Sequence, residues 1–500
     1  MRGDHGVRPR MLLRGRLTIA AGLGLLFFVA WALFAGDNGA SATESGPLPV
    51  AADVAAFPES DTHPRDNPGD EPDPVEPDLP VPLPDDLKVP KAELAAGAEG
   101  AVPAAILARV PIPPPGGGAG RAPRLVASGA SAQVTRGQRV IEVVPTRGDA
   151  GVTSLRVEYT LDAGLTDAIY DIFARGRVSL GLAVVMDPAT GEVLAYAGTD
   201  PRRLPPDQLY PAASLVKVVT AAAALQNVPG AAYRTCRFVG SPYRLTPSRV
   251  TPPKRGTEIT LERALATSNN QCFAQLAVND LGQTRLLETF QRFGLLQSPG
   301  PGHSRGEADT PGEDRFALGK LGCGLAGLHI TALHAAELAA TVADGKRVAP
   351  RWIARVTDAS GRELALPPQP KPQFVMPAAT AAQLREMMVA TTQSGTARRA
   401  FRGRVGRPLL REMTVAAKTG SLSGKTPPGR YEWFIGLAPA SRPKIAIAVL
   451  VVQAKRWHTT ASQVGAQVLN AIFCSGNVCR VERADQWLAA RTSSAKRALD

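Results

Sequence analysis

The sequence has few aromatic residues and few side chains that bind metals. Phe, Tyr and Trp make up 5% of its 500 residues, with six histidines and five cysteines. The histidines form no His-Glu-x-x-His helix and the cysteines show no metal-ligand spacing, so no metal or other cofactor is expected. The formal net charge is +13, but the basic residues are dispersed and aromatics are scarce, so no nucleic-acid partner is expected. Such a charge suits an anionic wall or membrane surface.

The few cysteines fit a compartment in which disulfides can form. They are Cys236, Cys272, Cys323, Cys474 and Cys479. Cys474 and Cys479 are close enough in the sequence to close a small loop. Unpaired structural cysteines are an equally good interpretation.

Only one long hydrophobic run occurs. Residues 17–35 are uncharged and close to the roughly 20 residues that a helix needs to cross a bilayer. Residues 1–16 are rich in arginine, whereas Asp37 follows the run. This asymmetry predicts a cytoplasmic segment over 1–16, a single transmembrane helix, and the remaining chain outside the cytoplasmic membrane, periplasmic or extracellular. A cleaved signal peptide ending near Ala40–Ala42 is the alternative, although the apolar core of such peptides usually has about 7–15 residues.

After this run the composition predicts a linker and then one large domain. Residues 36–138 are first rich in proline and acid and then in Ala, Gly and Pro, so a linker region of mostly irregular structure is expected, without an assigned function. Strand-like alternation begins near Arg139. The predicted domain spans 139–480, and a C-terminal tail spans 481–500.

Strand signals lie at both ends of the predicted domain. In GLAVVMDPATGEVLAYAG, the turn 187–191 separates two apolar runs and predicts a hairpin. Near the other end, 414–422, 431–440 and 444–454 are strand-like runs separated by turns. The sequence between the two ends is mostly Ala- and Leu-rich helix. These patterns predict an α+β fold, with an antiparallel sheet flanked by helices and a mostly helical subdomain.

A serine followed three residues later by a lysine opens one helical segment. A serine hydroxyl is a poor nucleophile at neutral pH and needs a base. If Ser214 begins the helix implied by VKVVTAAAAL, Lys217 lies on the same face, and a desolvated lysine can lose its proton and act as that base. Alone, the pair is more often an ordinary helix start with Ser214 as its cap.

Two further short motifs follow at long intervals. Ser268–Asn270 offers a hydroxyl and a carboxamide that can relay a proton and hold a substrate amide. Lys418–Gly420 lies on a strand-like run, where Gly420 allows close backbone approach and Lys418 with Thr419 can bind a carboxylate. Each motif alone is more often a turn or a strand end. In this order, after the Ser-x-x-Lys pair, they assemble a serine acyl-transfer site.

The ordered set resembles the motifs of penicillin-binding proteins and serine β-lactamases. Other stretches are similar to the transpeptidase domain of penicillin-binding proteins, and the resemblance extends roughly from Val157 to Phe473. They include LERALATSNNQCFAQLA, GLHITALHAAELAATVADG, TTQSGTARRAF and WFIGLAPASRPKIAIAVLVV. The resemblance implies a β-lactamase/transpeptidase-like fold.

The resemblance also implies residue roles. Ser214 would be the acylated nucleophile, Lys217 its base and Ser268 the proton relay to the leaving amine. The residues that would bind substrate are Asn270, Lys418, Thr419, Gly420 and Ser421. The backbone amides of Ser214 and Ser421 would form the oxyanion hole.

The function implied by the resemblance is that of a peptidoglycan D,D-transpeptidase. It would form a serine acyl-enzyme with D-alanyl-D-alanine stem peptides, crosslink them, and bind penicillin. Its expected partners are these stem peptides, β-lactams, the cytoplasmic membrane through the N-terminal helix, and cell-wall synthesis proteins. A D,D-carboxypeptidase or β-lactamase that uses water as acceptor would carry the same motifs. A non-catalytic β-lactam sensor or cell-wall scaffold is the alternative of another class, although it has no need of intact motifs.

Overall fold

The computed structural model describes residues 102, 107, 110, 112, 124–127, 130–133, 140–143, 155–358, 360–403, 409–411, 413–453 and 458–489. The hydrophobic run 17–35 and the basic segment before it lie outside these residues. The chain divides into two compact units, Met1–Pro82 and Leu83–Asp500, and every described residue belongs to the second. In this described part, no helix is long and apolar enough to cross a membrane.

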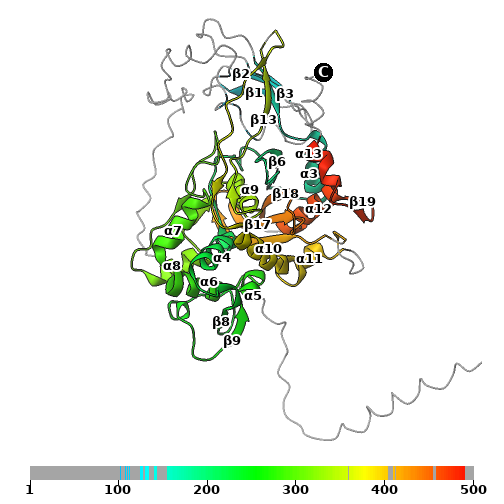
Figure 1. The fold of residues 1–500 in the computed structure, drawn as a ribbon. Helices are drawn as coiled ribbons and strands as arrows, with labels where there is room; N and C mark the ends of the chain where they lie inside the picture. Colours follow the sequence, from blue (N-terminus) through cyan, green and yellow to red (C-terminus); the bar gives the residue numbers. More distant parts are fainter. Residues whose placement is uncertain are drawn as a thin grey trace, which may run out of the picture. The chain divides into compact units, whose positions relative to one another are not determined.

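A five-stranded antiparallel sheet forms the centre of the second unit (Figure 1). In spatial order its strands are β16 (Ala416–Lys425), β17 (Pro428–Ala438), β18 (Ile445–Gln453), β5 (Gly181–Met186) and β6 (Val193–Gly198). In the turn between β5 and β6, Asp187 accepts hydrogen bonds from the Ala189 N–H and the Thr190 hydroxyl. The hairpin predicted at this turn is confirmed, as are the three strands predicted near the C-terminal end.

Helices cover both faces of this sheet. α9 (Ala332–Thr341) packs on one face, and α3 (Ala163–Arg175) and α12 (Ala461–Phe473) pack on the other. Every residue of β18 is buried. Ala448 belongs to the hydrophobic cluster that contains α9, whereas Ile447 belongs to the cluster of α3 and α12. The sequence of a strand that is buried on both faces is typically a continuous apolar run, as in β18.

A mostly helical subdomain lies beside the sheet (Figure 1). Its elements are α4 (Val216–Asn227), α5 (Leu261–Ala266), α6 (Asn270–Leu276), α7 (Gly282–Arg292) and α8 (Arg315–Cys323), with the hairpin of β8 (Thr235–Phe238) and β9 (Thr257–Thr260). α4 is buried from Val216 to Ala224 and contacts the other four helices. A mostly apolar helix that is buried on all sides is typical of a core position. The predicted α+β class is therefore confirmed, with its sheet and its helical part.

The structure contains two disulfides among the described residues. Cys236–Cys272 joins β8 to α6, and Cys474–Cys479 closes the small loop expected from their spacing. Cys323, at the end of α8, is buried and free. The first disulfide ties the β8–β9 hairpin to the helix that follows the Ser-Asn-Asn motif.

A second antiparallel sheet contains the strands expected near Arg139. Its order is β14 (Glu363–Leu364), β13 (Ile353–Thr357), β4 (Leu155–Tyr159) and β3 (Val140–Val143). Part of the range expected as a linker is also ordered against this unit. The Val110 side chain is buried, and its carbonyl oxygen accepts a hydrogen bond from Trp352 Nε1 at 3.1 Å.

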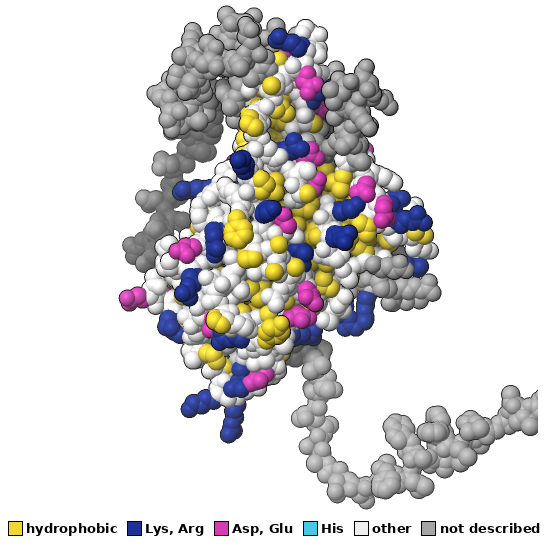
Figure 2. Space-filling model, in the orientation of Figure 1, with side chains coloured by type: hydrophobic (Ala, Val, Ile, Leu, Met, Phe, Trp, Pro, Cys, Tyr) yellow, Lys and Arg dark blue, Asp and Glu magenta, His cyan; other side chains and the backbone are white. Residues whose placement is uncertain are grey.

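Further elements frame the two sheets and the helices. They are β1 (Arg124–Ala127), β2 (Ala130–Gln133), β7 (Tyr210–Pro211), β10 (Glu307–Ala308), β11 (Leu328–Ile330), β12 (Lys346–Arg347), β15 (Gln373–Phe374), α10 (Ala378–Gln393), α11 (Arg398–Phe401), β19 (Cys474–Ser475), β20 (Val478–Cys479) and α13 (Arg483–Ala489). α10 packs against β16, and α13 packs against α12 within the range expected as a tail. On the face shown in Figure 2, Lys and Arg side chains are spread among acidic ones rather than gathered in one patch.

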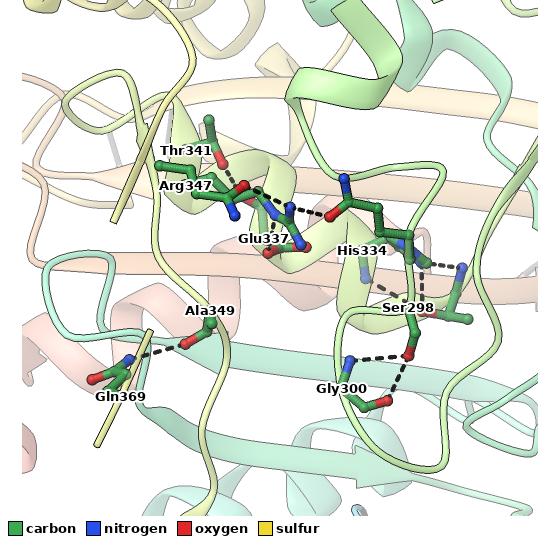
Figure 3. Close-up of polar contacts among 11 residues, drawn as sticks. Ser298, Gly300, His334, Glu337, Thr341, Arg347, Ala349 and Gln369 are labelled. Atoms are coloured by element: carbon green, nitrogen blue, oxygen red, sulfur yellow. Dashed lines mark hydrogen bonds and ion pairs between the residues drawn. The ribbon is translucent and has the colours of Figure 1, made fainter. Parts of the chain in front are cut away.

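A buried ion pair fastens α9 to the segment that follows it (Figure 3). Arg347 donates from Nε to Glu337 Oε1 and from Nη1 to Gln297 Oε1, both at 2.7 Å. Gly294 leaves room for the guanidinium, because a Cβ there would overlap it. His334 Nε2 lies 2.7 Å from the Gln297 carbonyl oxygen. Burial raises the pKa of Glu337 to about 7, although the charge of Arg347 opposes this rise.

Candidate active site

The first motif lies where a short turn leads into α4. The turn, Ala213–Leu215, is followed directly by the helix, so Ser214 and Lys217 are about one turn apart. Ala213 has a φ of 49°, in the left-handed region that residues other than glycine rarely adopt. A Cβ on Gly324 would overlap the Ala213 carbonyl oxygen and lie 3.2 Å from Ser214 N. The end of α8 therefore fixes the backbone that presents Ser214.

Lys217 is fully buried at the centre of the site. Its Nζ lies 2.7 Å from Ser214 Oγ, 2.8 Å from Asn270 Oδ1 and 2.6 Å from the Cys323 carbonyl oxygen. Three oxygen neighbours favour the charged ammonium, whereas burial favours the neutral amine. Burial is the larger effect and lowers the pKa of Lys217 to about 8. A neutral amine at this position can accept the proton of Ser214.

The second motif occupies the turn between α5 and α6. Ser268 is buried and has a φ of 58°, again in the left-handed region. Asn269 begins α6, and its Oδ1 accepts a backbone N–H of the first turn at 3.1 Å. Asn270 donates from Nδ2 to the Tyr243 carbonyl oxygen at 2.7 Å. This bond orients its Oδ1 toward Lys217.

The lysine of the third motif extends from β16 toward the second motif. Lys418 is fully buried, and its Nζ donates to Ser268 Oγ at 3.0 Å and to the Thr419 carbonyl oxygen at 2.6 Å. Burial, and secondly the charge of Lys217, hold the pKa of Lys418 well below the ordinary lysine value. The Ser268 hydroxyl therefore has a partner that orients it and that can exchange a proton with it.

The glycine of the third motif brings the edge of the sheet to the nucleophile. A Cβ on Gly420 would lie 3.2 Å from Ser214 N and 3.3 Å from Ala213 Cβ. This space is tight for any side chain, which favours glycine. Ser421 follows directly on β16.

All of the predicted site residues meet in one place. They are Ser214, Lys217, Ser268, Asn270, Lys418, Thr419, Gly420 and Ser421. Segments from α4, from the α5–α6 turn and from β16 therefore converge, although the sequence separates them widely. The described part of the chain holds no cluster of three or more His, Cys, Asp or Glu side chains suited to a metal.

Four groups in the site were not singled out in the sequence. The Thr396 hydroxyl lies 2.6 Å from that of Thr419. Cys323 and Tyr243 contribute carbonyl oxygens, and Gly324 contributes space. Backbone groups leave no side-chain signal in a sequence. Thr396, by contrast, lies in TTQSGTARRAF, one of the stretches that carried the family resemblance.

A protein-family model matches this chain over the segments that build the site. The model is the penicillin binding protein transpeptidase domain, and it matches residues 181–473. This match covers more than half of the chain. The chain belongs to this family. The resemblance seen in the sequence is confirmed, and every predicted site residue lies inside the matched range of this penicillin-binding-protein domain.

Named relatives and solved structures agree with the family. The chain is 29% identical over 345 residues to the peptidoglycan D,D-transpeptidase PbpA of Mycolicibacterium smegmatis, covering 59% of this chain and 67% of the relative. It is 26% identical over 374 residues to the peptidoglycan D,D-transpeptidase FtsI of Escherichia coli, covering 68% and 58%. An imipenem acyl-enzyme complex of penicillin-binding protein A from M. tuberculosis is similar with a TM-score of 0.51 at 27% identity, covering 63% of this chain and 79% of that chain.

Proposed function

We propose that this chain is a peptidoglycan D,D-transpeptidase that forms a serine acyl-enzyme with D-alanyl-D-alanine stem peptides and crosslinks them. One observation carries the proposal: the buried Lys217, with its lowered pKa, lies 2.7 Å from Ser214 Oγ. The names of the M. smegmatis and E. coli relatives support the substrate class. The imipenem acyl-enzyme of a similar protein supports binding of β-lactams.

Acylation begins at the Ser214 hydroxyl. Its oxygen attacks the carbonyl of the penultimate D-alanine while its proton passes to neutral Lys217. The backbone amides of Ser214 and Ser421 stabilise the negative charge that develops on the carbonyl oxygen. Ala213 and Gly324 hold the Ser214 amide in place before substrate binds, which lowers the cost of reorganisation.

Breakdown of the tetrahedral intermediate breaks the C–N bond of the scissile amide. The leaving amine takes a proton from the Ser268 hydroxyl, which Lys418 orients at 3.0 Å, and the terminal D-alanine departs. The acceptor amine then attacks the ester and gives a proton back to Ser268, while Ser214 recovers its proton from Lys217. Asn270 holds the substrate amide.

The acceptor distinguishes this proposal from its alternatives. With water as acceptor the same site would serve a D,D-carboxypeptidase or a β-lactamase, which the names of the relatives do not favour. Incubation with a D-alanyl-D-alanine peptide and an amine acceptor separates these activities. A crosslinked product supports transpeptidation, whereas hydrolysed peptide alone contradicts it. A sensor or scaffold would give neither product.

The proposal includes a location and partners. The hydrophobic run 17–35, preceded by arginines, supports a single-pass anchor in the cytoplasmic membrane with the catalytic domain outside. There the enzyme would act on stem peptides and bind β-lactams. Cell-wall synthesis proteins would be its protein partners.

The first test is covalent labelling with fluorescent penicillin, read as a band on a denaturing gel. Full-length protein in detergent should be labelled, and Ser214→Ala should not, because no other hydroxyl lies against Lys217 Nζ among the described contacts. Ser360→Ala, at an exposed turn, is the matched control and should be labelled like the wild type. Absence of label on folded wild-type protein would remove the proposed mechanism.

A further inference from the structure

The loop between β8 and β9 contains basic residues and no acidic ones. Over residues 239–256 its charged side chains are Arg244, Arg249, Lys254 and Arg255. None of the four forms an ion pair with another described residue. This excess is local, because basic and acidic side chains are mixed over the face shown in Figure 2. Like charges without acidic partners repel one another, and an anionic ligand relieves that repulsion.

The backbone of this loop is held by amide side chains of α6. Gln271 is fully buried and donates to the carbonyl oxygens of Val239 and Ser241 at 2.9 and 2.8 Å. Gln275 donates to the Arg249 carbonyl oxygen at 3.2 Å. The disulfide between β8 and α6 fastens the start of the loop to the same helix. Satisfied buried polar groups hold a segment in one arrangement, so the loop presents its side chains on a fixed backbone.

One part of the loop contacts the site directly. The carbonyl oxygens of Pro242 and Tyr243 accept hydrogen bonds from Asn270, at 2.8 Å from its backbone N–H and at 2.7 Å from Nδ2. Asn270 Oδ1 lies 2.8 Å from Lys217 Nζ, which lies 2.7 Å from Ser214 Oγ. Three successive hydrogen bonds therefore connect the loop backbone with the nucleophile. The loop borders the site beside the second motif, and β16 borders it beside the third.

The side chain that follows this contact is available to a ligand. Arg244 is exposed, and its guanidinium makes no hydrogen bond with another described residue. Its carbonyl oxygen accepts a hydrogen bond from Arg249 Nη1 at 2.9 Å, which brings a second guanidinium against its backbone. Tyr243, the preceding residue, is 56% exposed. Guanidinium groups match carboxylates in shape, and an aromatic ring packs on apolar groups. The surface therefore fits an acidic peptide with small apolar side chains.

We propose that Arg244, with Arg249 beside it, is a specificity-determining residue that binds a carboxylate of the acceptor stem peptide. The inference rests on the proposed function and deepens it, because it assigns a surface to the second substrate. During transfer the donor acyl group is bound to Ser214, so the acceptor needs a surface of its own. Electrostatic attraction at the loop raises the concentration of acidic acceptors near the ester. Transfer to a peptide amine is thereby favoured over hydrolysis.

The test measures acceptor binding to full-length protein in detergent after benzylpenicillin has acylated it, so that the place of the donor is filled. The probe is a fluorescein-labelled stem peptide with free carboxylates, followed by fluorescence anisotropy, and its carboxamide form is the neutral comparison. Arg244→Gln should weaken binding of the acidic peptide about fivefold, the scale of an exposed guanidinium–carboxylate pair. Binding of the neutral peptide should stay the same. Arg244→Lys should retain most of the binding of the acidic peptide.

Two controls separate the acceptor from the donor and from net charge. The rate of labelling with fluorescent penicillin reports on the donor side, and Arg244→Gln should leave it unchanged. Lys371 is exposed and precedes β15, outside the β8–β9 loop. Lys371→Gln removes the same charge from the protein, and this variant should bind both peptides like the wild type.

Several outcomes would overturn the assignment. Equal weakening for the acidic and the neutral peptide would mean that Arg244 only supports the loop, and an equal effect of Lys371→Gln would indicate general attraction of charge. Binding of the acidic peptide that is absent, or unchanged in Arg244→Gln, would mean that the acceptor binds elsewhere. Tighter Arg244-dependent binding of a glycerol phosphate polymer would assign the loop to that polymer. In all these cases the wild type is acylated and the proposed function stands. Failure of benzylpenicillin to acylate the wild type would remove both.

Discussion

Burial decides the chemistry of Lys217. An exposed lysine would remain protonated near neutral pH and could not take the proton of Ser214. Position 217 is instead in the first turn of α4, the helix that is buried from its first residue. Its desolvation lowers the pKa to about 8. The position of the helix therefore suits an ordinary lysine to the proposed role of base.

The acylation rate should therefore depend on pH through Lys217. The neutral amine is the active form, so the rate constant with benzylpenicillin should rise as pH increases, with a midpoint near 8. Below the midpoint it should fall about tenfold per pH unit. Stopped-flow or competition labelling between pH 6 and 9 measures the profile, with stability checked at each pH. A flat profile, or one that falls with rising pH, would contradict Lys217 as the base.

Backbone conformation marks the site as clearly as the side chains do. Among the described residues other than glycine, three have positive φ: Arg177, Ala213 and Ser268. Two of these three flank or carry the hydroxyls proposed as catalytic, those of Ser214 and Ser268. Such conformations cost roughly 1–3 kcal/mol each and persist where the surrounding structure imposes them, often at functional sites. The sequence gives no sign of the positive φ at Ala213, because alanine rarely adopts the left-handed conformation.

At the scale of elements, α9 depends on a buried charge. The Glu337–Arg347 pair lies between this helix and β12, and removal of one partner leaves the other buried without compensation. Arg347→Met should destabilise the protein by about 3 kcal/mol, and Glu337→Leu/Arg347→Met by less than the sum of the single substitutions. Denaturant unfolding of the four proteins measures the coupling.

An exposed ion pair provides the control for this double-mutant cycle, in which the double substitution is compared with the two single ones. Arg355 and Glu158, on neighbouring strands β13 and β4, are 2.8 Å apart, but their side chains are 53% and 31% exposed. Their cycle should give a coupling of less than about 1 kcal/mol, because water screens the charges. Equal coupling in both cycles would show that burial does not set the strength of the α9 pair.

Elements were predictable where one local pattern dominates. The turn DPATG between two apolar runs predicted the β5–β6 hairpin, and strand-like runs separated by turns predicted β17 and β18. Shorter elements such as β12 and β15 have no such pattern, since only two residues of each pair. Buried Val110 also gave no signal, because its burial depends on contact with the distant Trp352.

At the scale of the whole molecule, the site lies where the sheet meets the helical subdomain. α4 and the α5–α6 turn supply two motifs and β16 supplies the third. The backbone at Gly324 and at Gly420 packs closely against the backbone around Ser214, where a Cβ at either glycine would be crowded. Packing of the two parts against each other therefore creates the site.

The proposed anchor makes a prediction for the whole chain. Deletion of residues 1–35 removes the hydrophobic run and should move the protein from the membrane to the soluble fraction, because the remaining described helices include none able to span a bilayer. Penicillin labelling of the truncated protein should persist. Cell fractionation followed by labelling measures both results. Full-length protein found mainly in the soluble fraction would contradict the anchor.

The sequence alone determined the fold class, the order of the three motifs and the family, because each follows from local patterns or from residue identities at fixed spacing. The tertiary structure decided which charges persist, which backbone groups complete the site and where an arginine from the neighbouring strand reaches. Ser421 and Arg430 are nine residues apart and meet only through the register of β16 and β17. Burial, register and close approach are properties of the folded chain, so no single segment encodes them.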